Sequence, residues 1–193
     1  MKKTKLFLTL FVAIMSLQSY SQKSNEFRFY YGTSDSEFLR ESMDGGGNYK
    51  ITNFNEFGIK YLRQLLGNFY IETGINYSKS DVKITPEFMG EPVSSRFEKL
   101  EIISIPIYGN YTFWKYLFVN GGPILDFQTS DNSTDSQSGI GYSLGIGGKY
   151  DFNKFLIFIN PNYKRHSVIP FEKENNHQKL TELGVQIGLG YKF

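Results

Sequence analysis

The sequence predicts an all-β fold, an eight-stranded antiparallel up-and-down transmembrane β-barrel, and three observations support this fold class. Long segments alternate between apolar and polar residues, and the segments that connect them are long and short in turn. Aromatic residues, which favour strands, are frequent, with 14 Tyr and 18 Phe among 193 residues. A chain of this length forms one domain with a sizeable buried surface.

The first 21 residues have the pattern of a secretory signal peptide. Lys2, Lys3 and Lys5 form a basic start, residues 6–17 are apolar, and Ser19-Tyr20-Ser21 is a small-x-small cleavage site. A membrane-spanning helix needs roughly 20 apolar residues, so a retained anchor is the weaker alternative. We expect a signal peptide at 1–21 and a mature domain at 22–193.

Charge and cysteine content exclude several classes of function. Cleavage removes three of the 21 Lys and Arg residues and none of the 19 Asp and Glu residues, which leaves 18 − 19 = −1. Without a basic excess or a Lys/Arg cluster, nothing supports nucleic-acid binding. The absence of Cys excludes a disulfide framework, a thiolate nucleophile and a Cys-based zinc site.

The last residues of the sequence show the alternation most clearly. From position 183 to 193 every odd position is apolar or aromatic, whereas the even positions from 182 to 192 are polar or Gly. A period of two separates the two faces of a strand, and about 11 residues span a bilayer when the strand is tilted. Residues 140–152 repeat the pattern. We expect strands near 25–33, 51–63, 68–78, 98–113, 116–128, 139–152, 155–165 and 179–193.

The connections between these strands fall into two groups that alternate along the chain. Residues 34–50, 79–97, 129–138 and 166–178 are long and polar, whereas 64–67, 114–115 and 153–154 are short. Barrels of outer membranes have long loops on the outer side and tight turns on the periplasmic side. The loop lengths therefore favour a membrane barrel.

The polar face of the strands combines Gly with long charged side chains of both signs. Six acids and five bases share this face: Glu26, Arg28, Glu56, Lys60, Glu72, Asp126, Lys149, Asp151, Lys164, Glu182 and Lys192. Nearly equal numbers are expected if the charges pair inside a narrow lumen. The alternative is a soluble barrel on which these residues face water.

Aromatic residues are expected to form two belts around an aliphatic middle. Near the turns lie Phe27, Phe29, Tyr61, Phe69, Phe113, Trp114, Tyr150, Phe152, Phe155, Tyr191 and Phe193, and nearer the loops lie Tyr31, Tyr77, Phe127, Tyr142 and Tyr163. Between them lie Ile71, Ile75, Ile103, Ile105, Ile107, Leu144, Ile146, Val185 and Ile187. This order matches the cross-section of a bilayer.

Several short motifs resemble the PorT-like outer-membrane β-barrel domain family. Residues 100–107 resemble its "LEIP" strand, 70–79 its strand ending in "YS-K", 119–123 its "GGP" strand, and 141–148 and 188–193 its last two glycine-rich strands. The motifs occur in the family's order over most of the mature chain. The resemblance implies a barrel in the outer membrane of a Bacteroidetes-type bacterium, at residues 22–193, and no general catalytic site.

The sequence offers no catalytic, cofactor-binding or metal-ligating residues that we would assign. His166 and Ser167 are adjacent in the sequence, and an outer-membrane lipid A deacylase uses a His and a Ser for catalysis. However, adjacent residues on a strand point to opposite faces, so these two could act together only if the chain bends there. His166 and His177 with Glu172 or Glu174 could bind a metal, although a loop with two His is more often simply solvated. We expect no enzyme and no cofactor.

Three classes of function stay open, and a structural or surface-interaction barrel that displays its loops leads them. A narrow pore is the alternative, a membrane-embedded lipid-modifying enzyme is a weaker one, and a lipocalin-like carrier would need an apolar interior. Expected partners are lipopolysaccharide and phospholipid of the outer membrane, and the barrel assembly machinery, because Phe193 resembles the terminal aromatic signal which that machinery reads. No nucleic acid is expected, and the extracellular ligand or protein partner is unknown.

Overall fold

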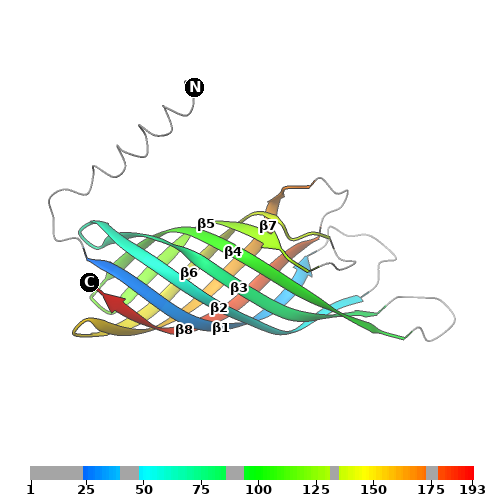
Figure 1. Cartoon of the computed structure of the whole chain (residues 1–193), viewed down its shortest axis with the longest axis horizontal. Helices are drawn as coiled ribbons and strands as arrows, with labels where there is room; N and C mark the ends of the chain where they lie inside the picture. The colour runs from blue at the N-terminus through cyan, green and yellow to red at the C-terminus, as the bar shows by residue number, and fades with distance from the viewer. Residues whose placement is uncertain (1–23, 40–47, 86–93, 131–134, 173–177) are drawn as a thin grey trace, which may run out of the picture.

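The computed structural model shows a closed barrel of eight antiparallel strands that follow one another in chain order (Figure 1). It describes residues 24–39, 48–85, 94–130, 135–172 and 178–193. The strands are β1 (Asn25–Leu39), β2 (Asn48–Leu66), β3 (Phe69–Thr85), β4 (Arg96–Phe113), β5 (Leu117–Gln128), β6 (Gly139–Phe152), β7 (Phe155–Pro170) and β8 (Lys179–Lys192). The predicted fold class and all eight predicted strands are confirmed.

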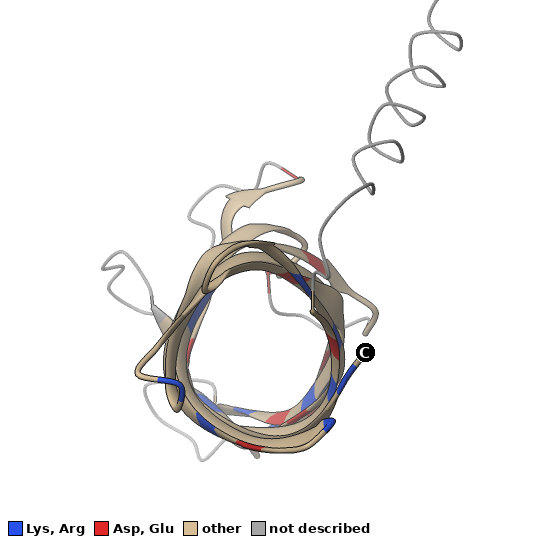
Figure 2. Cartoon of the chain, turned by 90° about the vertical axis from the view of Figure 1, so that its left-hand side faces the viewer, with Lys and Arg blue, Asp and Glu red and all other residues tan. Residues whose placement is uncertain are grey.

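Closure depends on the pairing of the first strand with the last. β1 and β8 pair from Glu26↔Lys192 to Leu39↔Lys179 without a register shift, so the sheet has no free edge. The alternation predicted for β8 is present, because Leu183, Ile187 and Leu189 are exposed on the outside and Glu182 and Gln186 are buried inside. Figure 2 shows the result end-on as a single ring of strands carrying acidic and basic residues.

Three tight turns connect the strands at one end of the barrel, which we call the turn end. Trp114 and Lys115 both have positive φ, 51° and 67°, as the two central residues of a type I′ hairpin turn require. Gly67 and Asn153 have positive φ in the other two turns. Asn25 and Phe193 also lie at the turn end, where each backbone N–H bonds the carbonyl of the other at 3.1 and 3.0 Å.

At the opposite end, the loop end, the strands are longer than the sequence suggested. β3 continues to Thr85, β4 begins at Arg96 and β7 continues to Pro170, within segments predicted as loops. The segment from Lys79 to Ile84 keeps the alternation, but the polarity of its two faces is reversed relative to the rest of β3. Its outward residues are charged, and Ser80, Val82 and Ile84 are buried inside. Its polar composition indicated a loop, but its period of two makes a strand.

The outer surface has the predicted belt of apolar residues. Near the turn end, rings of Phe27, Phe193 and Tyr191 stack in sequence, with centroids 5.5 and 6.3 Å apart. Nearer the loop end, the ring of Tyr31 contacts that of Phe57, and the ring of Tyr142 contacts that of Tyr163. Isoleucine and leucine side chains of the middle are exposed, Leu144 by 61%. The described residues include no helix that is long and apolar enough to cross a membrane.

Leu144→Arg is expected to lower the free energy of unfolding in lipid by roughly 2–4 kcal/mol, because it places a charge near the bilayer midplane. Leu66→Arg, at an 82% exposed position at the turn end of β2, is the control and should cost about 1 kcal/mol or less. Denaturant titration of protein refolded into vesicles measures both. Equal costs would contradict the assignment of the outer face to lipid.

Candidate functional site: the barrel interior

A network of buried charged side chains occupies the middle of the barrel. Lys60 of β2 lies 2.9 Å from the Glu72 carboxylate of β3 and donates to the side-chain oxygen of Gln186 of β8, also at 2.9 Å. Asn110 and Asn120 donate to the same carboxylate at 2.8 and 3.2 Å. Because several donors surround Glu72, its charge is compensated away from water.

The network continues toward the loop end through Glu56. Its carboxylate accepts from the Tyr30 hydroxyl at 2.7 Å and from the Lys164 ammonium at 2.6 Å. Lys164 also lies 3.5 Å from Glu182, and Gln186 donates to Glu56 at 3.2 Å. Seven strands, all of them except β6, thus contribute to one chain of ion pairs and hydrogen bonds.

His166 completes the network and corrects a sequence prediction. We placed His166 in a loop, but it lies on β7 and is buried in the lumen, where its Nδ1 is 2.9 Å from Asp126 and its Nε2 is 2.8 Å from Glu182. Ser104 donates to the other oxygen of Asp126 at 2.6 Å. Two carboxylates at the two ring nitrogens require that both nitrogens donate, so His166 carries a positive charge.

A charged His166 balances the buried charges. The structure describes five buried acids, Glu26, Glu56, Glu72, Asp126 and Glu182, and four buried bases, Arg28, Lys60, Lys149 and Lys164. His166 makes the bases five. The other two predicted members of this face, Asp151 and Lys192, pair with each other at 2.6 Å at the turn end, where they are partly exposed. The pairing expected from the sequence is therefore present, with one histidine more than expected.

Apolar and aromatic side chains close the lumen below this network. The Arg28 guanidinium pairs with Glu26 and lies 5.0 Å from the ring centroids of both Phe118 and Phe158. Phe118 and Leu156 are fully buried, and both belong to one cluster with Tyr30 and Phe158. The guanidinium therefore packs against two rings inside the barrel at the turn end.

A second apolar cluster closes the lumen above the network, at the loop end. It consists of Ile51, Phe54, Val82, Ile84, Leu100, Ile102 and Leu180, with Phe38 packed against it. These inward side chains come from strand segments that were predicted as loops or as strand ends. The polar network therefore lies between two apolar layers.

Glycines of β6 provide room for this interior. A Cβ at Gly147 would lie 2.6 Å from the Ile159 carbonyl oxygen and 2.7 Å from Cε1 of the Phe118 ring, with Cζ of the ring nearer still. The neighbouring Gly148 faces outward, and a Cβ there would meet nothing nearer than 3.8 Å. The glycine-rich face expected from the sequence is thus a requirement for the aromatic seal at the turn end.

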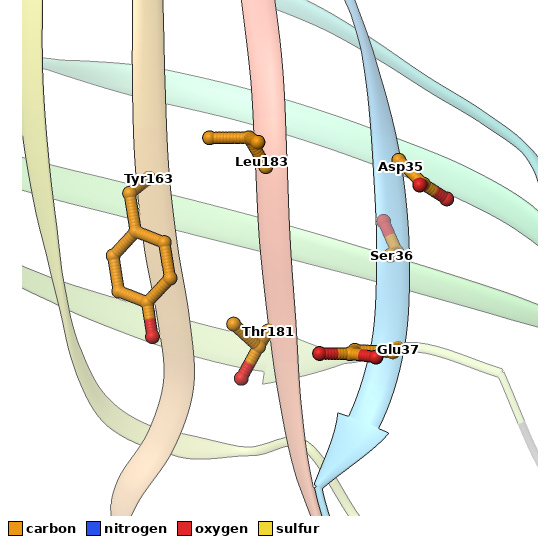
Figure 3. Close-up of a pocket in the computed structure, with 6 residues that line it drawn as sticks. All are labelled: Asp35, Ser36, Glu37, Tyr163, Thr181 and Leu183. Carbon is orange, nitrogen blue, oxygen red and sulfur yellow. The ribbon is translucent and has the colours of Figure 1, made fainter.

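A shallow groove lies on the outside near the loop end (Figure 3). Asp35, Ser36 and Glu37 of β1, Thr181 and Leu183 of β8 and Tyr163 of β7 line a volume of about 330 Å³. Pairing of β7 with β8 ends at Arg165↔Thr181. Beyond this point the side chain of Gln137 accepts a hydrogen bond from the backbone N–H of Leu180 and donates one to the carbonyl of Gln178, both at 2.9 Å. The loop between β5 and β6 thus replaces β7 as the partner of β8.

Of the two sites considered from the sequence, the structure describes all residues only for the pair His166 and Ser167. Ser167 has a φ of 46°, so the chain bends there and Ser167 is buried, but its hydroxyl donates to the Ser138 carbonyl at 3.4 Å while His166 engages two carboxylates. His177 and Glu174 lie outside the described residues. Among the described residues no group of three or more His, Cys, Asp or Glu has the arrangement of a metal site.

Comparisons with known proteins agree with this geometry. The model of the family described as outer membrane protein beta-barrel domain matches residues 6–193. The crystal structure of the outer membrane protein OprG from Pseudomonas aeruginosa is similar, with a TM-score of 0.58, 13% identity and coverage of 91% of this chain and 98% of OprG. The NMR structure of the outer membrane protein AlkL is similar with a TM-score of 0.59, 15% identity and coverage of 91% and 92%. No curated protein matches the chain.

Lys60→Met is expected to lower the free energy of unfolding by about 3–5 kcal/mol, because it leaves the Glu72 carboxylate buried without its cation. The double variant Lys60→Met/Glu72→Leu should recover part of this loss. Lys192→Met, which removes a partly exposed pair, is the matched control with a cost of about 1 kcal/mol or less. Denaturant titration in detergent measures the free energy of unfolding of each variant. If the cost of the double variant equals the sum of the costs of Lys60→Met and Glu72→Leu alone, the two side chains are not directly coupled.

Gly147→Ala is expected to destabilise the barrel by about 1–3 kcal/mol, because the added methyl group meets the Ile159 carbonyl and the Phe118 ring. Gly148→Ala is the control one residue away and should be neutral or slightly stabilising, since the space is open and the unfolded chain loses freedom. Thermal unfolding followed by circular dichroism compares the two. Equal midpoints would mean that β6 is not packed tightly against the seal.

Proposed function

Since the chain belongs to the outer membrane protein β-barrel domain family and lies in the outer membrane, we propose that it acts through the surface of its loop end, as a structural or interaction protein without catalytic activity. The turn end then faces the periplasm, as short turns do in such barrels, and the loop end faces outward. The groove of Asp35, Glu37 and Tyr163 is part of that outward surface.

The observation that carries this proposal is the filled interior. An eight-stranded barrel is just wide enough for side chains to fill, and here a balanced polar network lies between two apolar layers. A permeating ion would have to separate buried pairs such as Lys60–Glu72 and pass the rings that stack on Arg28. Continuous conduction is therefore disfavoured, and the outer surface is left as the place of action.

A narrow pore for small solutes is the second candidate, and one observation favours it. The middle of the interior is polar on all sides, so a rearrangement of side chains alone, without a change in the strands, would create a hydrated path. The outer-membrane location fits both candidates equally. Conductance distinguishes them.

A membrane-embedded lipid-modifying enzyme is the least supported of the three. His166 would have to leave Asp126 and Glu182, and Ser167 would have to leave the Ser138 carbonyl, before the two could act together. We propose no catalytic, cofactor-binding or metal-ligating residue.

Three finer assignments complete the proposal. The motif order supports membership of the PorT-like branch, and the basic-apolar-small pattern supports cleavage of residues 1–21 as a signal peptide. Besides lipopolysaccharide and phospholipid, the barrel assembly machinery is the proposed partner, with Phe193 stacked on Phe27 beside the β1–β8 seam.

Wild-type protein in a planar bilayer is expected to show no steady current, because both ends of the polar network are sealed. An open porin in the same bilayer is the positive control. The variant Phe118→Ala/Phe158→Ala, which removes both rings from Arg28, should raise the frequency of transient openings. A large stable conductance in the wild type would favour the pore over the surface role.

A further inference from the structure

We propose that Lys50 and Lys83 form a binding site for a phosphate group of the phosphorylated glycolipid in the outer leaflet. β2, β3 and β4 extend as a sheet at the loop end (Figure 1). The register and the burial pattern place the two lysines on the outside of this sheet, beyond the apolar belt. This inference concerns the lipid-facing rim of the barrel and does not depend on the proposed surface role.

The outward residues of these strands form rows across the sheet, given by the register. The last apolar row contains Phe57, Tyr77 and Ile103. The row above it contains Asn55, Lys79 and Glu101, and the next contains Thr52, Asp81 and Lys99. The third row above the belt contains Lys50, Lys83 and Phe97.

In the first two charged rows each lysine lies opposite an acid. Lys79 is 3.6 Å from Glu101, and Asp81 is the cross-strand partner of Lys99. Opposite charges on directly paired residues stabilise a sheet. The positive and negative charges within each of these two rows therefore balance, so neither row has an unpaired positive charge that would attract an anionic ligand.

The third row breaks this rule, because Lys50 is the direct cross-strand partner of Lys83. Cβ atoms of directly opposed residues are only about 4.5–5.5 Å apart, and like charges there are destabilising. Neither lysine takes part in an ion pair among the residues that the structure describes, and the ammonium of Lys83 lies 6.0 Å from the Phe97 ring centroid. An anion between the two ammonium groups removes the repulsion.

The position of the pair identifies the anion. Three rows correspond to six residues beyond Tyr77, which is about 20 Å along a strand and about 15 Å along the axis of a barrel with the usual strand tilt. That height is outside the hydrocarbon core, on the side of the polar headgroups. Phe97 is 69% exposed beside Lys83, so an amphipathic neighbour rather than bulk water suits this surface.

Phosphate chemistry fits two lysines better than a carboxylate does. A phosphate monoester carries close to two negative charges and three acceptor oxygens, which one pair of ammonium groups can share. Lysine acts as a flexible point charge toward phosphate, so both side chains can converge on one group. A lipid-borne phosphate is held at this height by its acyl chains, which lie against the apolar rows below, whereas a free phosphate is not.

The neighbouring part of the rim, at β1 and β8, supports the assignment by contrast. On β1 the outward residues at the loop end are Asp35 and Glu37, both exposed, beside Leu183 and Thr181 of β8. A phosphate would be repelled there. We therefore expect the glycolipid phosphate at the lysine pair of β2 and β3 and not beside the acidic residues of β1.

The test uses the full-length mature barrel refolded in detergent and titrated with fluorescent lipid A that carries its phosphates. Lys50→Gln/Lys83→Gln should weaken binding about thirtyfold, because each lysine near an anionic surface contributes a separate increment of affinity. Lys115→Gln/Lys154→Gln, which removes two lysines from the turn end, is the matched control and should leave the affinity unchanged. Equal affinities for all three proteins would overturn the proposal.

Two further arms identify the source of the phosphate. Lipid A without phosphates should bind the wild type and the Lys50/Lys83 variant equally weakly, and tight binding of it by the wild type would overturn the proposal. Inorganic phosphate alone should show no binding that depends on the two lysines. If it binds as tightly as lipid A does, the site is one for free phosphate and the lipid assignment is wrong.

A stability measurement separates a ligand site from a structural role. Without lipid A, Lys83→Gln should raise the midpoint of thermal unfolding, because it removes the repulsion from Lys50. With lipid A, the wild type should gain more stability than the variant. A lower midpoint for the variant without lipid A would show that the lysine pair stabilises the barrel by itself, against the proposal.

Discussion

Every backbone N–H and C=O group in the hydrocarbon region of a bilayer must find its partner within the protein, and this requirement determines the rest of the structure. A sheet meets it only when the last strand pairs with the first, as β8 does with β1 from Lys192 to Lys179. With eight strands, closure also sets the diameter, because strand number, tilt and stagger are linked. The narrow lumen is thus a consequence of backbone pairing.

A narrow lumen lined by polar residues needs internal compensation. The outer face is apolar because it contacts lipid, so the alternating pattern directs Glu56, Lys60 and Glu72 inward, away from bulk water. Each carboxylate then requires a cation and further donors, and these come from strands that are distant in sequence, such as Lys164 for Glu56 at 2.6 Å. Gly147 on β6 leaves the space that the Phe118 ring occupies.

Beyond the apolar belt the polarity of the sheet reverses, because the solvent changes from lipid to water. Val82, Ile84 and Leu100 point inward and form an apolar cluster, while Lys79, Asp81 and Lys99 point outward. The loop end is therefore organised like a water-soluble β-protein built on a membrane barrel. This gives the outward surface a rigid base, on which the groove beside Tyr163 and the lysine pair of β2 and β3 are held.

The sequence by itself determined the number of strands, their alternation and the direction of the loops, because a period of two and tight turns are local properties. It also indicated that charges such as Lys60 and Glu72 share one face. Only the tertiary structure decided which charges pair, because cross-barrel partners depend on register and closure. The structure shows that His166, which was predicted in a loop, lies in the lumen between Asp126 and Glu182, because β7 continues to Pro170 and keeps the inward alternation of Asn162 and Lys164. The extension of β3 was missed for a related reason: its apolar residues Val82 and Ile84 face inward, where only a closed barrel can bury them.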